Sequence, residues 1–278
     1  MVFELLRDCF TPEGPTSGFD LMFDLCTHIA QGRVFASTAY LLGASCLLAL
    51  EKPSSDIRPI PVGEILYRLV ARTLGFQFQE ALADHFSPLQ FGVAMRGGCE
   101  TIIHGLRATL DLHPDWVVLQ VDIQKAFNIV SWEALFCELR SAIGSLDQLF
   151  PFVRSFYARR SPLYFSHCSH EDEVSLFSPE SGTRQGDPLG SSLFALAHLR
   201  ALRTVASEHP LCLFPSLADD IHIVGPPEDV MPTFHTLEGH LSAVGLIVQP
   251  TKCVAWSPSG LPSSLSLPPG FSLPFEGL

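Results

Sequence analysis

Residues 216–225 read Ser-Leu-Ala-Asp-Asp-Ile-His-Ile-Val-Gly, and the rest of the chain is organised around this stretch. Two adjacent acids, Asp219 and Asp220, stand between apolar residues at 211–214 and 221–224. Residues of high β-propensity around a short polar break indicate a β-hairpin with the acids at or beside its turn. In a straight strand the two side chains would point to opposite faces, whereas at a turn they can converge.

Converging carboxylates in such a turn predict a bound cation. Two neighbouring negative charges repel each other unless protons or cations neutralise them, and hard oxygen ligands suit Mg²⁺ or Mn²⁺. The alternative is an ordinary solvated Asp-Asp turn, which this stretch taken alone favours. The rest of the chain has to decide between these two interpretations.

The composition is that of a globular chain with an acidic balance. Hydrophobic residues make up 47% of the 278 residues and charged residues 17%, which predicts one large domain or two small ones with a substantial core. The formal net charge of −12 opposes extended contact with phosphate backbones, because such contact normally needs a basic face.

The cysteines and the N-terminus indicate the compartment. The 8 cysteines are scattered without a Cys-x-x-Cys pair, and the N-terminus lacks the basic start of a secretory signal. We therefore expect reduced thiols in an intracellular protein rather than disulfides or a zinc site. The uncharged run at 34–50 is shorter than the ~20 residues that span a bilayer, so it predicts a buried helix and no membrane partner.

The spacing of apolar residues predicts a mixture of helices and strands. Residues 18–50 are expected to be mostly helical, and the prolines of 56–62 to hold that segment extended. Ser131 suits the N-cap of one helix, and Asp187 followed by Pro188 suits the start of another. Further helices are expected over 64–86, 99–111 and 229–243, a strand buried on both faces over 116–122, and a turn and strand after Gly245.

Short motifs recur in a fixed order along the chain, although each alone is a weak signal. They are Arg58-Pro59-Ile60, Gln90-Phe91-Gly92-Val93 with Gly97-Gly98, Asp122-x-x-x-Ala126-Phe127-Asn128, Gln185-Gly186-Asp187-Pro188-Leu189, Ala218-Asp219-Asp220, and Gly245-Leu246 with Lys252. In this order they resemble the reverse transcriptase domain of non-LTR, LINE-like retrotransposons, over residues 30–256.

The resemblance implies an α+β fold with the fingers and palm of a right-hand polymerase. An antiparallel palm sheet would carry the acids, with helices packed behind it. Residues 1–115 would form N-terminal helices and fingers, residues 116–256 the palm, and residues 257–278 a Pro/Ser-rich tail without fixed structure. No helical thumb is recognisable after Lys252.

The resemblance also implies RNA-directed DNA synthesis, with an RNA template, a DNA primer and deoxynucleoside triphosphates as partners. This nucleotidyl transfer uses two Mg²⁺ ions (or Mn²⁺) ~4 Å apart, and carboxylates from two strands must meet to hold them. By resemblance Asp122 and Asp219 are the principal metal ligands, with Asp220 beside them. Family members carry Tyr or Phe before Ala-Asp-Asp, whereas this chain has Leu217, a change that bears on fidelity or primer placement rather than on metal binding.

Three further residues are assigned to the nucleotide by resemblance. Phe127 resembles the sugar gate, a ring packed where a ribose 2′-hydroxyl would sit, and the alternative is an ordinary core aromatic. Gln185 and Gly186 resemble the loop that lines the nucleotide pocket, where glycine lets the backbone approach the ligand. The alternative for that loop is an ordinary turn at a helix entry.

Four basic residues are candidates for phosphate contacts. Lys52, Arg58 and Arg72 would bind the triphosphate, since several cations must offset its charge. Lys252 stands where the family has a lysine that protonates the leaving pyrophosphate. A solvated surface charge is the alternative for each of them.

Two other functions remain open on the sequence alone. A truncated or degenerate retroelement fragment, folded but inactive and at most a binding module, would fit the acidic charge and the unrecognised thumb. A metal-dependent phosphohydrolase would explain the carboxylates but neither Arg58-Pro59-Ile60 nor the Gln-Gly-Asp-Pro-Leu loop.

Overall fold

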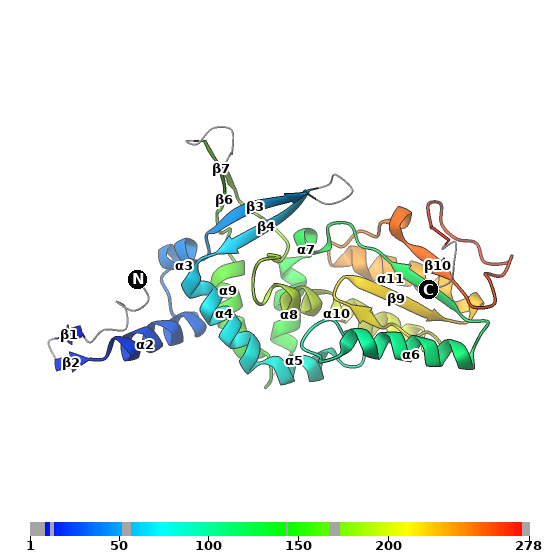
Figure 1. Ribbon diagram of the computed structural model, residues 1–278, viewed down its shortest axis with the longest axis horizontal. Helices are drawn as coiled ribbons and strands as arrows, with labels where there is room; N and C mark the ends of the chain where they lie inside the picture. The colour runs from blue at the N-terminus through cyan, green and yellow to red at the C-terminus, as the bar shows by residue number, and fades with distance from the viewer. Residues whose placement is uncertain (1–8, 12–13, 52–56, 143, 167–172, 274–278) are drawn as a thin grey trace. The chain divides into compact units, whose positions relative to one another are not determined.

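The structure is a computed structural model that describes residues 9–11, 14–51, 57–142, 144–166 and 173–273 (Figure 1). The chain divides into two units. The first consists of Met1–Gln77, Asp147–Glu180 and Gly186–Pro188, and the second of Phe78–Leu146, Ser181–Gln185 and Leu189–Leu278. The boundary expected at 115/116 differs from this division, in which residues 78–115 belong with the second unit.

The first unit combines a mixed sheet with helices. Its sheet has the strand order β4-β3-β6-β7, in which β3 and β6 are parallel and the other pairs antiparallel. Helix α2 packs on α4 and α9, and α3 also packs on α9. The elements are β1 Cys9–Thr11, β2 Gly14–Thr16, α2 Gly18–Ala30, α3 Ala36–Leu42, β3 Ser45–Glu51, β4 Ile57–Gly63, α4 Ile65–Gln77, η1 Asp147–Leu149, α9 Phe150–Tyr157, β6 Leu163–Ser166 and β7 Val174–Phe177.

Aromatic side chains form the core of the first unit. The ring of Tyr67 on α4 stacks on Phe152 and meets Phe156 edge-on, both on α9, with centroid distances of 5.5 and 4.8 Å. These rings are almost fully buried, which is the main reason that the two helices hold together.

The second unit carries an antiparallel sheet with the strand order β10-β5-β9-β8. The expected antiparallel sheet with helices behind it is thereby confirmed: α11 packs on β5 and β9, and α10 packs on α5, α8 and α11. The elements are α5 Gln79–Phe86, α6 Gly98–Leu112, β5 Val117–Val121, α7 Ala126–Ile129, α8 Trp132–Ser141, α10 Gly190–Glu208, β8 Ser216–Leu217, β9 Asp220–Gly225, α11 Pro227–Ala243, η2 Pro250–Lys252 and β10 Val254–Trp256.

The two faces of the antiparallel sheet differ along β5 and β9. One face presents Leu119, Val121, Ile221 and Ile223, all fully buried. On the other face Val118 pairs with Val224 and is covered by leucines of α6, whereas Gln120, two residues further on, is only half-buried. Side chains alternate along a strand, so the side chain of Asp122, two residues after Gln120, lies on this second face as well.

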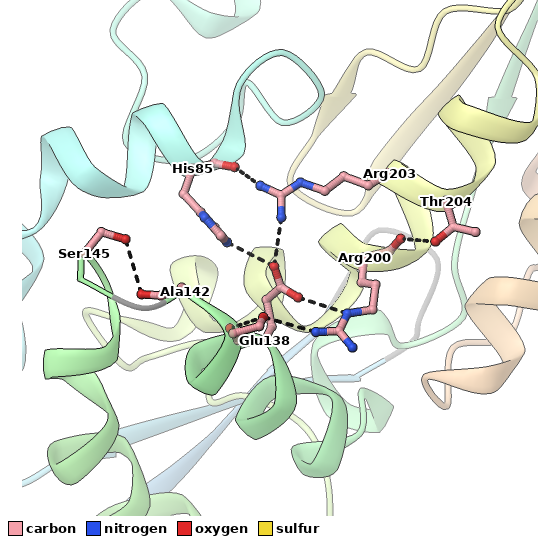
Figure 2. A network of polar contacts seen from close by, with 8 residues as sticks. His85, Glu138, Ala142, Ser145, Arg200, Arg203 and Thr204 are labelled. Atoms are coloured by element: carbon pink, nitrogen blue, oxygen red, sulfur yellow. Dashed lines mark hydrogen bonds and ion pairs between the residues drawn. The ribbon is translucent and has the colours of Figure 1, made fainter.

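A buried acid joins three helices of the second unit (Figure 2). Glu138 on α8 lies 3.0 Å from His85 Nε2 on α5, and 3.3 and 3.0 Å from Arg200 Nε and Arg203 Nη1 on α10. Arg203 also donates to the His85 carbonyl oxygen at 2.6 Å. Burial alone would raise the pKa of Glu138, but the hydrogen bond from His85 and the three basic neighbours outweigh it and lower that pKa.

Two expectations for residues 18–50 are wrong. Residues Ser45–Glu51 form strand β3, which pairs along its whole length with β4, the extended segment that the prolines predict. The run at 34–50 is also not a buried helix, since Phe35 and Leu41 are 85% and 65% exposed. An extended neighbour with free pairing groups outweighs the helical preference of this run.

The start of α10 also differs from the expectation. The helix begins at Gly190 with Leu189 as a cap residue without a side-chain hydrogen bond, so Asp187 is not its N-cap. The Asp187 carboxylate instead accepts hydrogen bonds from the hydroxyls of Tyr67 and Tyr157. Two buried hydroxyl donors outcompete the backbone N–H groups of a helix for this acid.

The Pro/Ser-rich segment is ordered over its described part, 257–273, contrary to the expected tail without fixed structure. Ser272 N–H donates to the Cys253 carbonyl oxygen at 2.9 Å, and Ala255 N–H donates to that of Ser272 at 3.1 Å. The ring of Phe271 meets Phe234 of α11 at 5.3 Å. These contacts attach the segment to the edge strand β10.

Candidate active site

The hairpin of residues 216–225 forms as predicted. Leu217 pairs with Asp220, so Ala218 and Asp219 are the two turn residues between β8 and β9. Ala218 is the first of the two and has φ +56°. Asp219 therefore occupies the turn itself, and Asp220 begins the following strand.

Strands β5 and β9 bring two of the predicted acids together. Val121 pairs with Ile221, so Asp122 and Asp220 take adjoining positions at the end of the same ladder. Residues opposite each other in an antiparallel pair share a face of the sheet. Asp122, Asp219 and Asp220 are all partly exposed, which leaves this end of the sheet accessible to a ligand.

Residues 249–253, which precede strand β10, hold the backbone of Asp122. Its carbonyl oxygen accepts from the N–H of Gln249 at 2.9 Å, and its N–H lies 3.4 Å from the Cys253 sulfur. Burial raises the pKa of the Cys253 thiol; the hydrogen bond from Asp122 opposes this effect, and the charges of Asp122 and Glu238 add to it. The thiol is therefore a neutral packing group beside the acid.

Lys252 lies in this tethered segment. It ends the short helix η2, its N–H donates to the Gln249 carbonyl oxygen at 3.0 Å, and it is exposed. The residues on both sides that contact Asp122 fix the Lys252 backbone close to the acid, while the side chain is open to solvent.

His222 is a titratable neighbour of these acids. It lies two residues beyond Asp220 on the same face, opposite Gln120. Its Nδ1 donates to the Pro215 carbonyl oxygen at 3.2 Å. Burial lowers the pKa of His222 despite that hydrogen bond and the charge of Asp220, which both raise it. The imidazole is consequently neutral at physiological pH.

The donor set suits a hard divalent cation, but only with oxygen atoms from a substrate. Over the described ranges, no group of three or more His, Cys, Asp or Glu side chains is arranged to hold a metal ion. Mg²⁺ in nucleotide enzymes typically takes one or two carboxylates together with substrate phosphates and water. Asp122 and Asp220 in adjoining positions, with Asp219 in the turn, fit that smaller requirement.

Phe127 lies on the short helix α7 and is half-buried. Its ring stacks on Phe194 of α10, with centroids 4.6 Å apart. The Phe127 carbonyl oxygen accepts from the N–H of Thr183 at 2.6 Å, and Trp132 Nε1 donates to the Gly182 carbonyl oxygen at 2.6 Å. The loop that leads to Gln185 is thus attached beside Phe127.

Gln185 is exposed at the end of this loop, and Gly186 follows it in the first unit. A Cβ on Gly186 would collide with the Pro61 carbonyl oxygen, so only glycine allows this approach. The glycine of the Gln-Gly-Asp-Pro-Leu motif therefore also has a packing role.

Two of the predicted phosphate ligands, Arg58 and Arg72, belong to the first unit, whereas the acids belong to the second. Arg58 on β4 and Arg72 on α4 are exposed residues of the first unit, and the Arg72 guanidinium lies 5.6 Å from the Phe76 ring centroid. Lys52 lies outside the described residues. Their part in triphosphate binding stays a prediction.

One residue of the site was missed by the sequence reasoning. Gln90 is fully buried, and its side-chain amide bonds to both backbone groups of Ala218. The sequence assigns the motif Gln90-Phe91-Gly92-Val93 to the family resemblance and indicates no separate role for Gln90. A glutamine two residues before a glycine was the available signal, but its burial and its contact with a turn 128 residues away required the fold.

The chain belongs to the family "Reverse transcriptase (RNA-dependent DNA polymerase)", whose sequence model matches residues 50–264. The chain is also 28% identical over 224 residues to the "Retrovirus-related Pol polyprotein from type-2 retrotransposable element R2DM" of Drosophila melanogaster. The resemblance to retrotransposon reverse transcriptases is thereby confirmed. That alignment covers 76% of this chain and 20% of the relative, so the chain spans about a fifth of the relative's length.

Solved structures with the same fold support the fingers-and-palm expectation. The apo telomerase of Candida tropicalis, truncated from its C-terminal domain, matches with a TM-score of 0.60 at 13% identity, over 80% of this chain and 51% of that one. The telomerase of Candida albicans in complex with a fragment of telomeric RNA gives 0.59 at 14% identity, over 81% and 44%. An RNA-dependent RNA polymerase of a human picobirnavirus gives 0.52 at 16% identity, over 77% and 42%.

None of the described helices combines the length and the apolar character that crossing a bilayer requires.

Proposed function

We propose that the chain catalyses template-directed DNA synthesis on an RNA template, extending a DNA primer with deoxynucleoside triphosphates. The observation that carries this proposal is the placement of Asp122, just after β5, at a position adjoining Asp220 at the start of β9, with Asp219 in the turn between β8 and β9. Family membership supports the reaction class. The complex of the Candida albicans telomerase with RNA supports an RNA partner for this fold.

The acids at the sheet end would hold the metal ions. Asp122 and Asp219 are the proposed principal ligands, with Asp220 beside them, and Mg²⁺ is the proposed ion with Mn²⁺ as a substitute. Two bound ions activate the primer 3′-hydroxyl and stabilise the leaving pyrophosphate. The protein contributes the rigid strand ends that keep these carboxylates in place.

The nucleotide would lie between Phe127 and the loop at Gln185. The packing of the Phe127 ring on Phe194 supports a gate role, because a ring fixed from behind can exclude a 2′-hydroxyl. Lys252 is proposed to protonate the leaving pyrophosphate, supported by the tethering of its segment to Asp122. Lys52, Arg58 and Arg72 remain the proposed triphosphate ligands.

We assign the palm to the second unit and the fingers to the first. The antiparallel sheet with the acids supports the first assignment, and the arginine-bearing elements support the second. An intracellular location is part of the same proposal, supported by the scattered cysteines.

A second candidate is a folded but inactive binding module. The formal net charge of −12 favours it, because an acidic chain neutralises few backbone phosphates and therefore binds a template-primer weakly. The two candidates have the same fold, but only the polymerase would incorporate nucleotides.

Primer extension distinguishes them. The purified chain is assayed with poly(rA) and oligo(dT) in Mg²⁺ and in Mn²⁺, beside Asp122→Asn and Asp219→Asn. We expect extension by the wild type and none by either variant. Thermal melts with Mn²⁺ accompany the assay: metal-dependent stabilisation that both variants lose, without extension, would favour the inactive module.

A further inference from the structure

The turn that carries Asp219 is in an unfavourable backbone conformation. Ala218 has φ +56°, a left-handed value that residues with a Cβ adopt at a cost. Such conformations persist where the surroundings impose them, and they cluster at functional sites. The question is therefore what holds Ala218 in this conformation.

The side chain of Gln90 does so directly. Its Nε2 donates to the Ala218 carbonyl oxygen at 3.0 Å, and its Oε1 accepts from the Ala218 N–H at 2.8 Å. Oε1 also accepts from the Gly92 N–H at 2.8 Å, so two N–H groups identify this atom as the oxygen and fix the orientation of the amide. One buried amide thus satisfies both backbone groups of the strained residue.

The backbone on either side of Gln90 continues the attachment. Leu89 accepts from the Ser216 N–H, and Phe91 donates to the Ser216 carbonyl oxygen, each at 2.8 Å. Gly92 lies so close that a Cβ there would collide with the Ala218 nitrogen and stand 2.8 Å from the Leu217 carbonyl carbon. Residues 89–92 therefore act as an additional strand edge that encloses the first half of the hairpin.

We infer that Gln90 and Gly92 are positioning residues that fix the Ala218–Asp219 turn, and through it the orientation of the metal-binding carboxylate of Asp219. This inference rests on the proposed function. A neutral amide suits the task, because it fixes the turn without adding a charge that would compete for the cation.

The inference is tested on the full chain with four variants. Gln90→Met keeps the size and removes all three side-chain hydrogen bonds. Gly92→Ala adds the colliding Cβ, and Gly105→Ala is its matched control, since nothing lies within 4 Å of a Cβ at Gly105 on α6. The double variant Gln90→Met/Ala218→Gly lacks the Gln90 hydrogen bonds but has glycine at position 218, which adopts the left-handed conformation freely.

Two measurements are made on each variant. Hydrogen exchange of the Ala218 amide reports the clamp without any metal, with the Val224 amide as an internal reference. Mn²⁺ affinity from thermal melts reports its consequence for the carboxylate. We expect Gln90→Met and Gly92→Ala to weaken Mn²⁺ binding about tenfold, and Gln90→Met to accelerate Ala218 exchange at least as much. Gly105→Ala should match the wild type. The addition of Ala218→Gly to Gln90→Met should restore the Mn²⁺ affinity to within about threefold of the wild-type value.

The outcomes separate the clamp from the proposed function. If folded Gln90→Met shows an unchanged exchange rate at Ala218, or an unchanged Mn²⁺ affinity, the inference is overturned. It is also overturned if the double variant Gln90→Met/Ala218→Gly does not recover Mn²⁺ binding. If Gln90→Met does not fold, Gly92→Ala against Gly105→Ala decides it in the same way. A wild type that shows no Mn²⁺ response sensitive to Asp219→Asn would overturn the proposed function and the metal-positioning role together, whatever the exchange rates.

Discussion

The second unit holds its acids in two contrasting ways. The buried carboxylate of Glu138 lies against His85 and against two arginines that remain partly in solvent, Arg200 and Arg203 (Figure 2). Asp122, Asp219 and Asp220 are partly exposed at the end of a sheet, and the turn that carries Asp219 is held through a neutral amide and backbone groups.

The difference indicates what each set is for. A buried carboxylate with basic partners joins helices, and removing one partner leaves an unmatched charge. Neighbouring carboxylates at an exposed strand end repel each other unless a cation binds between them. Such a cluster is therefore a usual sign of a ligand site. The first set should therefore affect stability, and the second activity.

The largest expected effect is on activity. Asp219→Asn should lower primer extension by at least about 10³-fold, because a neutral amide is a poor ligand for Mg²⁺ and metal stabilisation of the transition state is worth several kcal/mol. The melting temperature without metal should stay close to that of the wild type. Asp111→Asn, an exposed residue at the end of α6, is the control that should retain full extension. Equal extension by both variants would contradict the site.

The next effect is on stability. Glu138→Gln removes the charge that pairs with the two arginines and should lower the free energy of unfolding by about 2 kcal/mol, the scale of lost hydrogen bonds to a charged group, because the arginines stay hydrated. Urea denaturation of the wild type, Glu138→Gln and Glu133→Gln measures it, with exposed Glu133 on the same helix as the control. If Glu138→Gln is as stable as Glu133→Gln, the network does not hold the three helices together.

A smaller effect concerns the selection of the sugar. Phe127→Val should lower the preference for dGTP over GTP by about tenfold, because the ring excludes the 2′-hydroxyl by volume. The ratio of incorporation is measured beside a thermal melt of each protein. Phe136→Val, a half-buried aromatic of α8, is the control for lost packing and should leave the ratio unchanged. An unchanged ratio for Phe127→Val with a large fall in melting temperature would instead identify Phe127 as a core residue.

The smallest effect is a dependence on pH. The pKa of Glu138 is lowered in the folded chain, so its contribution is complete above the ordinary value of 4.5 and is lost as the pH falls through the lowered value. The stability difference between the wild type and Glu138→Gln should therefore shrink on acidification below pH 4.5. Denaturation curves at neutral pH and at successively lower pH measure it. A constant difference would mean that the charge of Glu138 is not what the helices depend on.

Local patterns in the sequence predicted much of the second unit. The alternation in 216–225, the buried strand before Asp122 and the N-cap at Ser131 each depend on neighbouring residues. Ser131 accepts from the Ala134 N–H at 3.4 Å, as a capping residue does. Such features are settled within a few residues, which is why they can be derived from sequence.

The errors occurred where a distant partner decided the outcome. Ser45–Glu51 became a strand because β4 pairs with it, and Asp187 left the helix start for the hydroxyls of Tyr67 and Tyr157. The segment 257–273 is ordered because it pairs beside β10. Each depends on groups that the local pattern does not contain.

The sequence by itself determined the family, the order of the motifs and the acids that carry the proposed chemistry. The tertiary structure decided which backbone groups hold those acids: Gln249 and Cys253 behind Asp122, and Gln90 around Ala218. The physical reason is that hydrogen bonds need partners within about 3 Å, and only folding brings residues 90 and 218 to that distance.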